Sequence, residues 1–286
     1  MANEYTPEEL SQLHKELYEI LAEIIRVCKK HDISYFIQGG TAIGAFFENA
    51  ILPWDDDIDI GMTRKNYEKF IKIAPNELDS NYFLQSPHTD VHTPYYFTKV
   101  RKMNTLFVEK DFAHIKAHQG IFIDVFPFDK VPDSNTIQKI QRVISNFLNC
   151  CFMGKEIWMW KYFGKCEIDN PTNRGPLPCL ANRLCVSLLS KKNIYRLLRL
   201  SQSMFNGVSS TYYNMVLMPK DHISVHSIEN LQEVEFGPLK VMAPSDLETY
   251  LNHHYPRLRR VIPKEEQQNH RPTYLSFNTE ENNGEK

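Results

Sequence analysis

The stretch Pro53-Trp54-Asp55-Asp56-Asp57-Ile58-Asp59 decides the fold that we predict for this chain. From residue 57 to residue 60, polar and apolar residues alternate with a period of two, which is typical of a half-buried β-strand. Side chains two residues apart in a strand point to one face, so the carboxylates of Asp55, Asp57 and Asp59 are expected to lie together. No Lys or Arg occurs within the stretch. Grouped carboxylates then need a cation, and oxygen ligands select Mg²⁺ or Mn²⁺ first and Ca²⁺ second.

Two other interpretations of this acidic stretch remain to be compared. One is an exposed turn that binds nothing, which the alternation of Ile58 and Ile60 disfavours because it indicates a strand in the core. The other is a helix-loop-helix calcium loop, which requires glycine at its sixth position and glutamate at its twelfth. Counted from Asp55, those positions hold Ile60 and Asn66, so the calcium-loop interpretation fails.

A Gly39-Gly40-Thr41 turn lies just upstream, between a predicted strand over 34–38 and a predicted short helix over 41–48. Glycines let backbone N–H groups approach an anion closely, and the start of a helix favours negative charge. A plain tight turn is the alternative. A phosphate-binding turn next to a metal-binding strand is what phosphoryl transfer from a nucleotide requires.

Asp124 is the third acidic element, within the alternating segment 120–129. The alternation is expected to bury Ile121, Ile123 and Val125 on one face and to bring Asp124 onto the other face among aromatic side chains. A lone aspartate there is costly unless it is paired or bound to a metal. It is therefore either a capping or salt-bridged residue, or the third metal ligand or base of the same site.

The remaining pattern predicts an α+β fold. Thr6-Pro7-Glu8-Glu9 begins a helix that continues to about residue 30, and a second helix is expected over 64–74, before Pro75. Strands are expected over 82–85, 95–101, 105–109 and 120–126, with Asn104 in a turn. Helices are expected over 134–205, with a break at 169–176, followed by a hairpin at Gly237-Pro238 and a helix over 244–253. We expect a core over residues 1–130, a mainly helical part over 131–272, and a disordered tail over 273–286.

Composition narrows the function classes. The 286 residues include 33 basic and 35 acidic residues, a net charge of −2, which argues against nucleic acid as a partner. No basic, apolar leader or long apolar run is present, so we expect a cytoplasmic protein with reduced thiols. The aromatic-rich stretch 147–163 either packs internally or touches the inner face of the membrane. The cysteines Cys150, Cys151, Cys166 and Cys179 lack tight zinc-site spacing.

The Gly-Gly-Thr turn together with the acidic stretch resembles the signature of the LicD family, whose relatives include the fukutin-related proteins. The resemblance continues through 97–102, 122–127 and a C-terminal part that includes Ala243-Pro244, Tyr250-Leu251, Tyr255, Pro263 and His270. It covers about residues 13–271 and is weakest in the helical middle.

This resemblance implies a polymerase-β-like nucleotidyltransferase fold: a mixed sheet flanked by helices, with a mainly helical C-terminal half. It implies a phosphotransferase that moves a phosphoryl-alcohol group, most often from CDP-choline, to a sugar hydroxyl of a glycan or lipid-linked precursor and releases CMP. Two Mg²⁺ (or Mn²⁺) ions would serve the reaction. The catalytic residues would be Asp57, Asp59 and Asp124, with Asp55 as a further metal ligand, and the substrate-binding residues would be Gly39, Gly40, Thr41, Lys99, Arg101 and His270.

The chain departs from the family pattern at Phe46-Phe47-Glu48, where relatives commonly carry an arginine. Lys99 or Arg101 must then supply the positive charge for the donor, or the donor differs. Three alternatives therefore remain: transfer of ribitol phosphate or a phosphonate, nucleotidyl transfer to a small molecule with release of pyrophosphate, and metal-dependent binding without catalysis.

Overall fold

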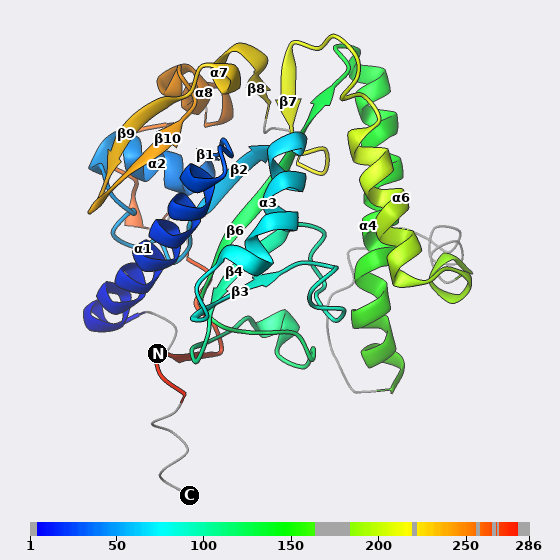
Figure 1. The fold of residues 1–286 in the computed structure, drawn as a ribbon, viewed down its shortest axis with the longest axis horizontal. Helices are drawn as coiled ribbons and strands as arrows, with labels where there is room; N and C mark the ends of the chain where they lie inside the picture. The colour runs from blue at the N-terminus through cyan, green and yellow to red at the C-terminus, as the bar shows by residue number, and fades with distance from the viewer. Residues whose placement is uncertain are drawn as a thin grey trace, which may run out of the picture.

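A mixed β-sheet runs through the middle of the protein and is flanked by helices (Figure 1). The computed structural model describes residues 5–163, 184–218, 222–255, 258–264, 267 and 269–279. The main strand order is β1-β2-β6-β4-β3; β2 and β6 are parallel, whereas the other neighbours in this order are antiparallel. The α+β fold class predicted from the sequence is confirmed.

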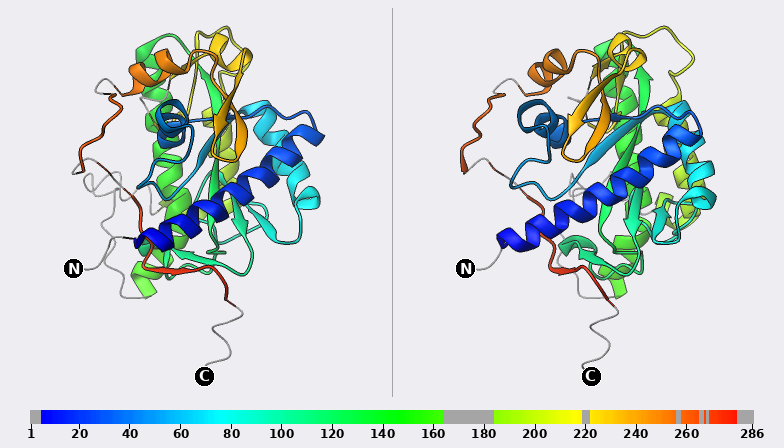
Figure 2. Two further views of the ribbon diagram at one scale, coloured as in Figure 1. Left: turned by 90° about the vertical axis from the view of Figure 1, so that its left-hand side faces the viewer. Right: turned by 60° about the vertical axis from the view of Figure 1, so that its left-hand side comes forward.

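Helix α1 (Pro7–Lys30) begins as its sequence predicts. The Thr6 side chain accepts a hydrogen bond from the Glu9 N–H, and the Glu9 side chain accepts one from the Thr6 N–H, which satisfies two free helix donors. Its apolar stripe, which includes Leu13, Leu17 and Ile20, is buried against the sheet and against α3 (Arg64–Glu77). Both helices therefore cover one face of the sheet (Figures 1 and 2).

Four predicted boundaries in the first half were wrong. The first strand, β1 (Phe36–Ile37), is shorter than expected, and β2 (Asp59–Thr63) begins two residues later than Asp57, because its pairing with β6 starts at Asp59. Helix α3 continues through Pro75, since the Leu78 N–H still donates to the Ala74 carbonyl beyond it. Helix α2 (Gly39–Glu48) was predicted and starts two residues earlier.

The next four strands were also predicted: β3 has the predicted bounds, and the ends of β4, β5 and β6 are shifted. They are β3 (Tyr82–Gln85), β4 (Thr98–Lys102), β5 (Leu106–Val108) and β6 (Phe122–Val131). Asn104 has a φ of 56° and forms the expected turn. Strand β6 extends beyond Phe126 because its second half pairs with Met62 and Thr63 of β2 and then with β7 (Tyr212–Asn214).

In the second half, α4 (Asn135–Phe163) and α6 (Lys191–Ser203) form a pair with a small core of its own. Next come β8 (Ile223–Ser224), α7 (Val225–Glu229), the predicted hairpin of β9 (Gln232–Phe236) and β10 (Leu239–Ala243), and the predicted helix α8 (Leu247–His254). Gly237 turns the hairpin with a φ of 58°, and a Cβ there would lie 2.4 Å from the Tyr18 ring. The predicted break at 169–176 and the cysteines Cys166 and Cys179 lie outside the described residues.

Part of the segment 273–286, which was predicted to be disordered, forms a strand. Strand β11 (Tyr274–Ser276) pairs with β5, so these three residues differ from the predicted disordered tail. Backbone hydrogen bonds that favour a strand are available there because β5 would otherwise be an open edge. Among the helices in the described ranges, none has the length and apolar content needed to cross a bilayer.

Candidate active site

The sheet brings Asp59 and Asp124 to the same place. Asp59 is the first residue of β2, and it lies directly opposite Asp124 on the parallel neighbour β6. The Asp124 N–H donates to the Ile58 carbonyl at 3.1 Å, which fixes this register. Directly paired residues point to the same face of a sheet, so the two carboxylates share one face. The aspartates were expected to lie on a strand from Asp57 onward, but Asp55 and Asp57 lie in the segment that leads into β2.

The Gly-Gly-Thr turn holds the start of β2. The Asp59 N–H donates to the Thr41 hydroxyl at 2.8 Å, and the Gln38 N–H donates to the Asp59 carbonyl at 3.2 Å. Thr41 was predicted to bind substrate; its hydroxyl oxygen instead contacts the backbone of the acidic strand. Thr41 is therefore positioned to orient Asp59.

The two glycines leave room for the carboxylates at the N-terminus of α2. A Cβ on Gly40 would lie 2.7 Å from an Asp55 carboxylate oxygen, and a Cβ on Gly39 would lie 3.4 Å from an Asp59 oxygen. Gly39 also has a φ of 57°, which favours glycine. The two glycines that suggested a phosphate-binding turn therefore also leave space for the carboxylates of Asp55 and Asp59.

The carboxylates disfavour one another's charge. Burial, followed by the charges of Asp57 and Asp56, raises the pKa of Asp55 to about 8. Burial and the charges of Asp57, Asp124 and Asp55 raise the pKa of Asp59 well above its usual value. Burial raises the pKa of Asp124 to about 6, against the lowering effect of Lys99. Lys99 offsets only part of this repulsion, and the oxygen donors of the group fit a hard divalent cation.

A cavity of about 620 Å³ is lined by Asp55, Asp57 and Asp59. This acidic wall also contains Gly40. Its other walls are formed by aromatic, apolar and basic side chains: Ile43, Leu52, Trp54, His254, Tyr255, Leu258, Arg259, Ile262 and His270. The cavity can therefore accept a ligand with both an anionic and an apolar part.

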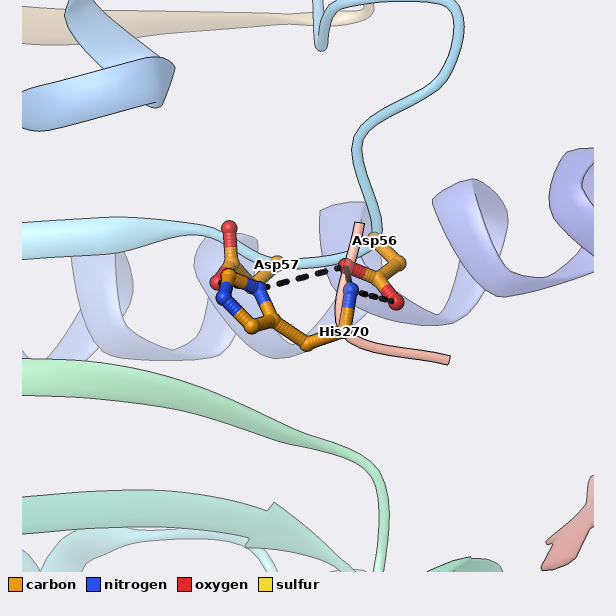
Figure 3. Close-up of side chains that lie close together, drawn as sticks. All are labelled: Asp56, Asp57 and His270. Atoms are coloured by element: carbon orange, nitrogen blue, oxygen red, sulfur yellow. Dashed lines mark hydrogen bonds and ion pairs between the residues drawn. The ribbon is translucent and has the colours of Figure 1, made fainter. Parts of the chain in front are cut away.

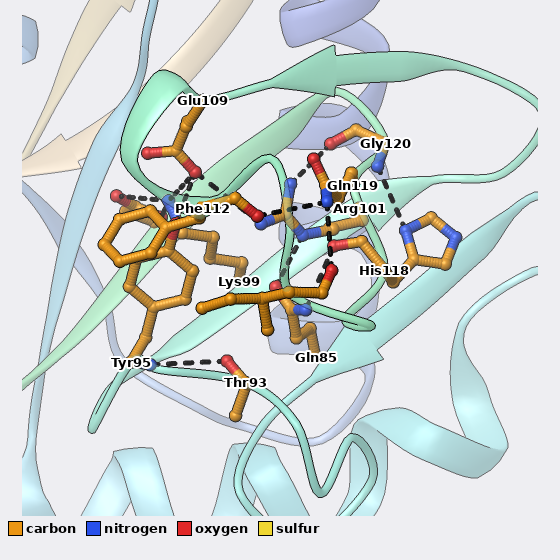
Figure 4. A network of polar contacts seen from close by, with 12 residues as sticks. Gln85, Thr93, Tyr95, Lys99, Arg101, Glu109, Phe112, His118, Gln119 and Gly120 are labelled. Carbon is orange, nitrogen blue, oxygen red and sulfur yellow. Dashed lines mark hydrogen bonds and ion pairs between the residues drawn. The ribbon is translucent and has the colours of Figure 1, made fainter. Parts of the chain in front are cut away.

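Lys99 and Arg101 take part in a buried network (Figure 4). Lys99 is 2% exposed, and its Nζ lies 3.0 Å from Asp124 Oδ1 and 3.4 Å from the Phe122 ring centroid. Arg101 donates to the Gln85 side chain at 2.5 Å and to the Gly120 carbonyl at 2.6 Å. Lys99 thus contacts a predicted catalytic carboxylate, whereas the guanidinium of Arg101 is held by protein groups. Neither of them lines the cavity.

His270, which was predicted to bind substrate, lies beside the acidic segment and lines the cavity (Figure 3). Its N–H donates to both carboxylate oxygens of Asp56 at 2.9 Å, and its ring Nδ1 lies 3.6 Å from an Asp57 oxygen. Asp56 is buried and also accepts a hydrogen bond from the Tyr5 hydroxyl at 2.7 Å. Asp56 therefore ties both ends of the chain to the site, and the His270 ring is 74% exposed.

Several residues around the site were not predicted to have a role there. The Tyr250 hydroxyl accepts a hydrogen bond from the Gly39 N–H at 3.2 Å, and Tyr255 and Arg259 line the cavity. Tyr250 and Tyr255 were part of the family resemblance, which was the available signal. Trp54 packs on the core and also lines the cavity.

Fold and site together define an α+β protein in which several carboxylates lie at the N-terminus of α2, a helix that begins with two glycines. Residues 32–152 match the family model described as LicD/FKTN/FKRP, nucleotidyltransferase domain. Through this segment the chain is similar to the LicD family.

Three curated proteins are similar in sequence to part of this chain. The lipopolysaccharide cholinephosphotransferase LicD of Haemophilus influenzae is 29% identical over 140 residues, which is 46% of this chain and 49% of that protein. An uncharacterized protein of Rickettsia typhi is 31% identical over 35% of this chain and 31% of its own length. One of Rickettsia prowazekii is 26% identical over 41% and 40%, respectively. The chain spans about half or less of the length of these relatives.

Proposed function

We propose that this protein is a metal-dependent phosphotransferase of the nucleotidyltransferase superfamily. It transfers a phosphoryl-alcohol group, phosphocholine first, from a CDP-activated donor to a sugar hydroxyl of a cell-surface glycan or its precursor, with release of CMP. The observation that carries the proposal is the convergence of Asp55, Asp57 and Asp59 in one cavity at the N-terminus of α2. The similarity to a cholinephosphotransferase supports this choice of donor.

The acidic residues have distinct roles in this proposal. Asp57 and Asp59, with Asp124 and Asp55, would hold two Mg²⁺ or Mn²⁺ ions. Each residue offers oxygen ligands, and Lys99 offsets only part of the repulsion between their charges. When bound, the ions offset the charge of the donor diphosphate and of the leaving CMP. Thr41 orients Asp59 through its backbone, so we assign Thr41 to positioning.

Asp124 is our candidate for the general base. Its pKa of about 6 keeps it largely ionised at neutral pH, and Lys99 stabilises that form. The acceptor hydroxyl would pass its proton to Asp124 as its oxygen bonds to phosphorus, and the bond from phosphorus to CMP would break. Lys99 then keeps the carboxylate oriented rather than binding the donor.

The cavity walls suit the two ends of the donor. Arg259 is our candidate for the cation that pairs with phosphate, in place of the arginine that Phe46-Phe47-Glu48 replaces. Trp54 and Tyr255 present aromatic surface, which attracts quaternary ammonium groups such as choline.

The test is a donor screen read out as CMP release. Purified protein is incubated with Mg²⁺, a sugar acceptor, and CDP-choline, CDP-ribitol or a nucleoside triphosphate. We expect the wild type to release CMP and to form a phosphocholine-modified acceptor. The rate of CMP release should be at least ~10³-fold lower for Asp57→Asn and for Asp59→Asn, which corresponds to a loss of ~4 kcal/mol in transition-state stabilisation. Asp111→Asn, which changes an exposed aspartate elsewhere, should retain the rate. Pyrophosphate release would instead identify a nucleotidyltransferase, and ligand binding without turnover would identify a binding module.

A further inference from the structure

Large aliphatic side chains are exposed along the outer side of the α4–α6 pair, which lies at one edge of the molecule (Figure 1). Each is 42–69% exposed, and on each helix they are mostly three or four residues apart, a spacing that forms a stripe. We call this surface the outer face. It consists of Ile137, Ile140, Val143 and Ile144 of α4 and Leu197, Leu200 and Met204 of α6 and its C-cap.

The two stripes lie on the same side of the pair. The hydroxyls of Ser145 and Ser201 are 2.8 Å apart, and the Phe152 ring packs on the Tyr195 ring, so the helices run antiparallel. Successive helical residues are rotated by about 100°. From the line of contact, each stripe is displaced by about 100° in the same sense around its own helix. In an antiparallel pair, equal rotation brings both stripes to one side.

The same two helices carry a strong positive charge. Their sequences contain eight basic residues and one acidic residue, although the whole chain has a net charge of −2. Lys139, Lys192 and Arg196 are exposed, and none of them forms an ion pair with another residue of the described ranges. Lys192, Arg196 and Arg199 also line a groove of about 360 Å³ next to His88.

We propose that the outer face docks on an anionic lipid bilayer. Exposed aliphatic side chains flanked by Lys and Arg are the features with which a helix binds the boundary between lipid headgroups and acyl chains. The groove beside the stripe offers cations to a lipid phosphate. A second copy is a poorer occupant, because joining two outer faces would bring positive charge against positive charge. This surface differs from the aromatic stretch 147–163, where Phe147 and Phe152 pack in the core of the pair.

Sedimentation with vesicles tests the proposal without relying on enzymatic activity. The full chain is mixed with vesicles of phosphatidylcholine alone or with added phosphatidylglycerol. We expect binding to the mixed vesicles that weakens as salt is added. Val143→Asp and Leu200→Asp should each lower the partition coefficient at least ~10-fold, and Arg196→Ala should lower it about fivefold.

Val261→Asp is the matched control, because Val261 is as exposed as Val143 but lies outside the outer face. Circular dichroism verifies that each variant is folded, which is expected because the changed side chains are exposed. Equal vesicle binding by Val143→Asp and Val261→Asp would overturn the proposal. Absence of vesicle binding, with a wild-type dimer that Leu200→Asp dissociates, would overturn it in favour of an interface between copies. Neither result changes the expected CMP release in the donor screen, so the membrane proposal can fail independently of the proposed function.

Discussion

The aspartates of the cavity oppose folding in the absence of a cation. Asp55 has a pKa of about 8 in the folded protein, against an ordinary value of 3.8. The folded state therefore holds a proton that the unfolded state releases, and this group makes the free energy of unfolding fall as pH rises from about 4 to about 8. Functional carboxylates commonly carry such a cost in stability.

Asp55→Asn should therefore stabilise the metal-free protein. In EDTA at pH 8, its melting temperature should exceed that of the wild type by about 2–4 °C for each kcal/mol of repulsion removed, and the gain should shrink towards pH 5. Mg²⁺ should raise the wild-type melting temperature more than that of the variant. A thermal scan at each pH, with and without Mg²⁺, measures both effects. A gain that does not vary with pH would contradict the assigned cause.

Lys99 and Asp124 should behave as a coupled pair. Lys99→Met leaves Asp124 buried without its counter-charge, which should lower the free energy of unfolding by ~3–5 kcal/mol. Adding Asp124→Asn to this variant should recover much of the loss. Urea unfolding of the two single variants and the double variant gives the coupling energy. Additive effects would show that the ion pair does not stabilise the fold.

At the scale of elements, the contact between the start of α2 and the acidic segment depends on Gly40. In Gly40→Ala, the new Cβ would meet Asp55 at 2.7 Å, so the helix or the carboxylate must shift. A displacement of ~1 Å in a catalytic group costs about 10²-fold in rate, and we expect a loss of this size together with a higher Mg²⁺ requirement. Gly207→Ala is the control, because a Cβ there meets nothing within 4 Å. Equal rates for the two variants would refute the close contact.

Sequence patterns predicted the elements around the site better than the contacts between them. Alternation in 57–60 and 120–126 identified the two strands that bring Asp59 and Asp124 together, since a period of two depends only on local burial. The start of β2 was misplaced because it depends on pairing with β6, a long-range contact. The contacts of Arg101 could not be predicted, because charge alone carries no information about partners such as Gln85.

At the scale of the whole molecule, Tyr5 near the start of the chain and His270 near its end meet at Asp56 of the acidic segment. Figure 2 shows that the segment around β11 lies near the start of α1. Arg271 pairs with Glu9 at 3.0 Å and its guanidinium lies 4.7 Å from the Tyr5 ring centroid, so the C-terminal segment is tied to the N-terminal one. The family model matches residues 32–152, and the candidate site also uses residues from both sides of that segment.

Tyr5→Phe tests this connection. The variant removes a donor from the buried Asp56, which should lower the free energy of unfolding by about 1–3 kcal/mol. Chemical denaturation provides the measurement, with Tyr212→Phe, a change at an exposed tyrosine, as the control. A loss no greater than that of the control would mean that the Asp56 carboxylate does not need this donor.

The contacts of Tyr5 and His270 with Asp56 also set the order in which the candidate site forms during synthesis. Asp56 and His270 are separated by 214 positions, and a ribosome adding about 5–20 residues per second needs roughly 10–40 s to cover that distance. Until then, the nascent sheet holds its aspartates without the backbone donor from His270 and without the cavity wall from Tyr255 and Arg259. Translation must therefore reach His270 before this wall of the cavity can form, and a product interrupted earlier would lack it.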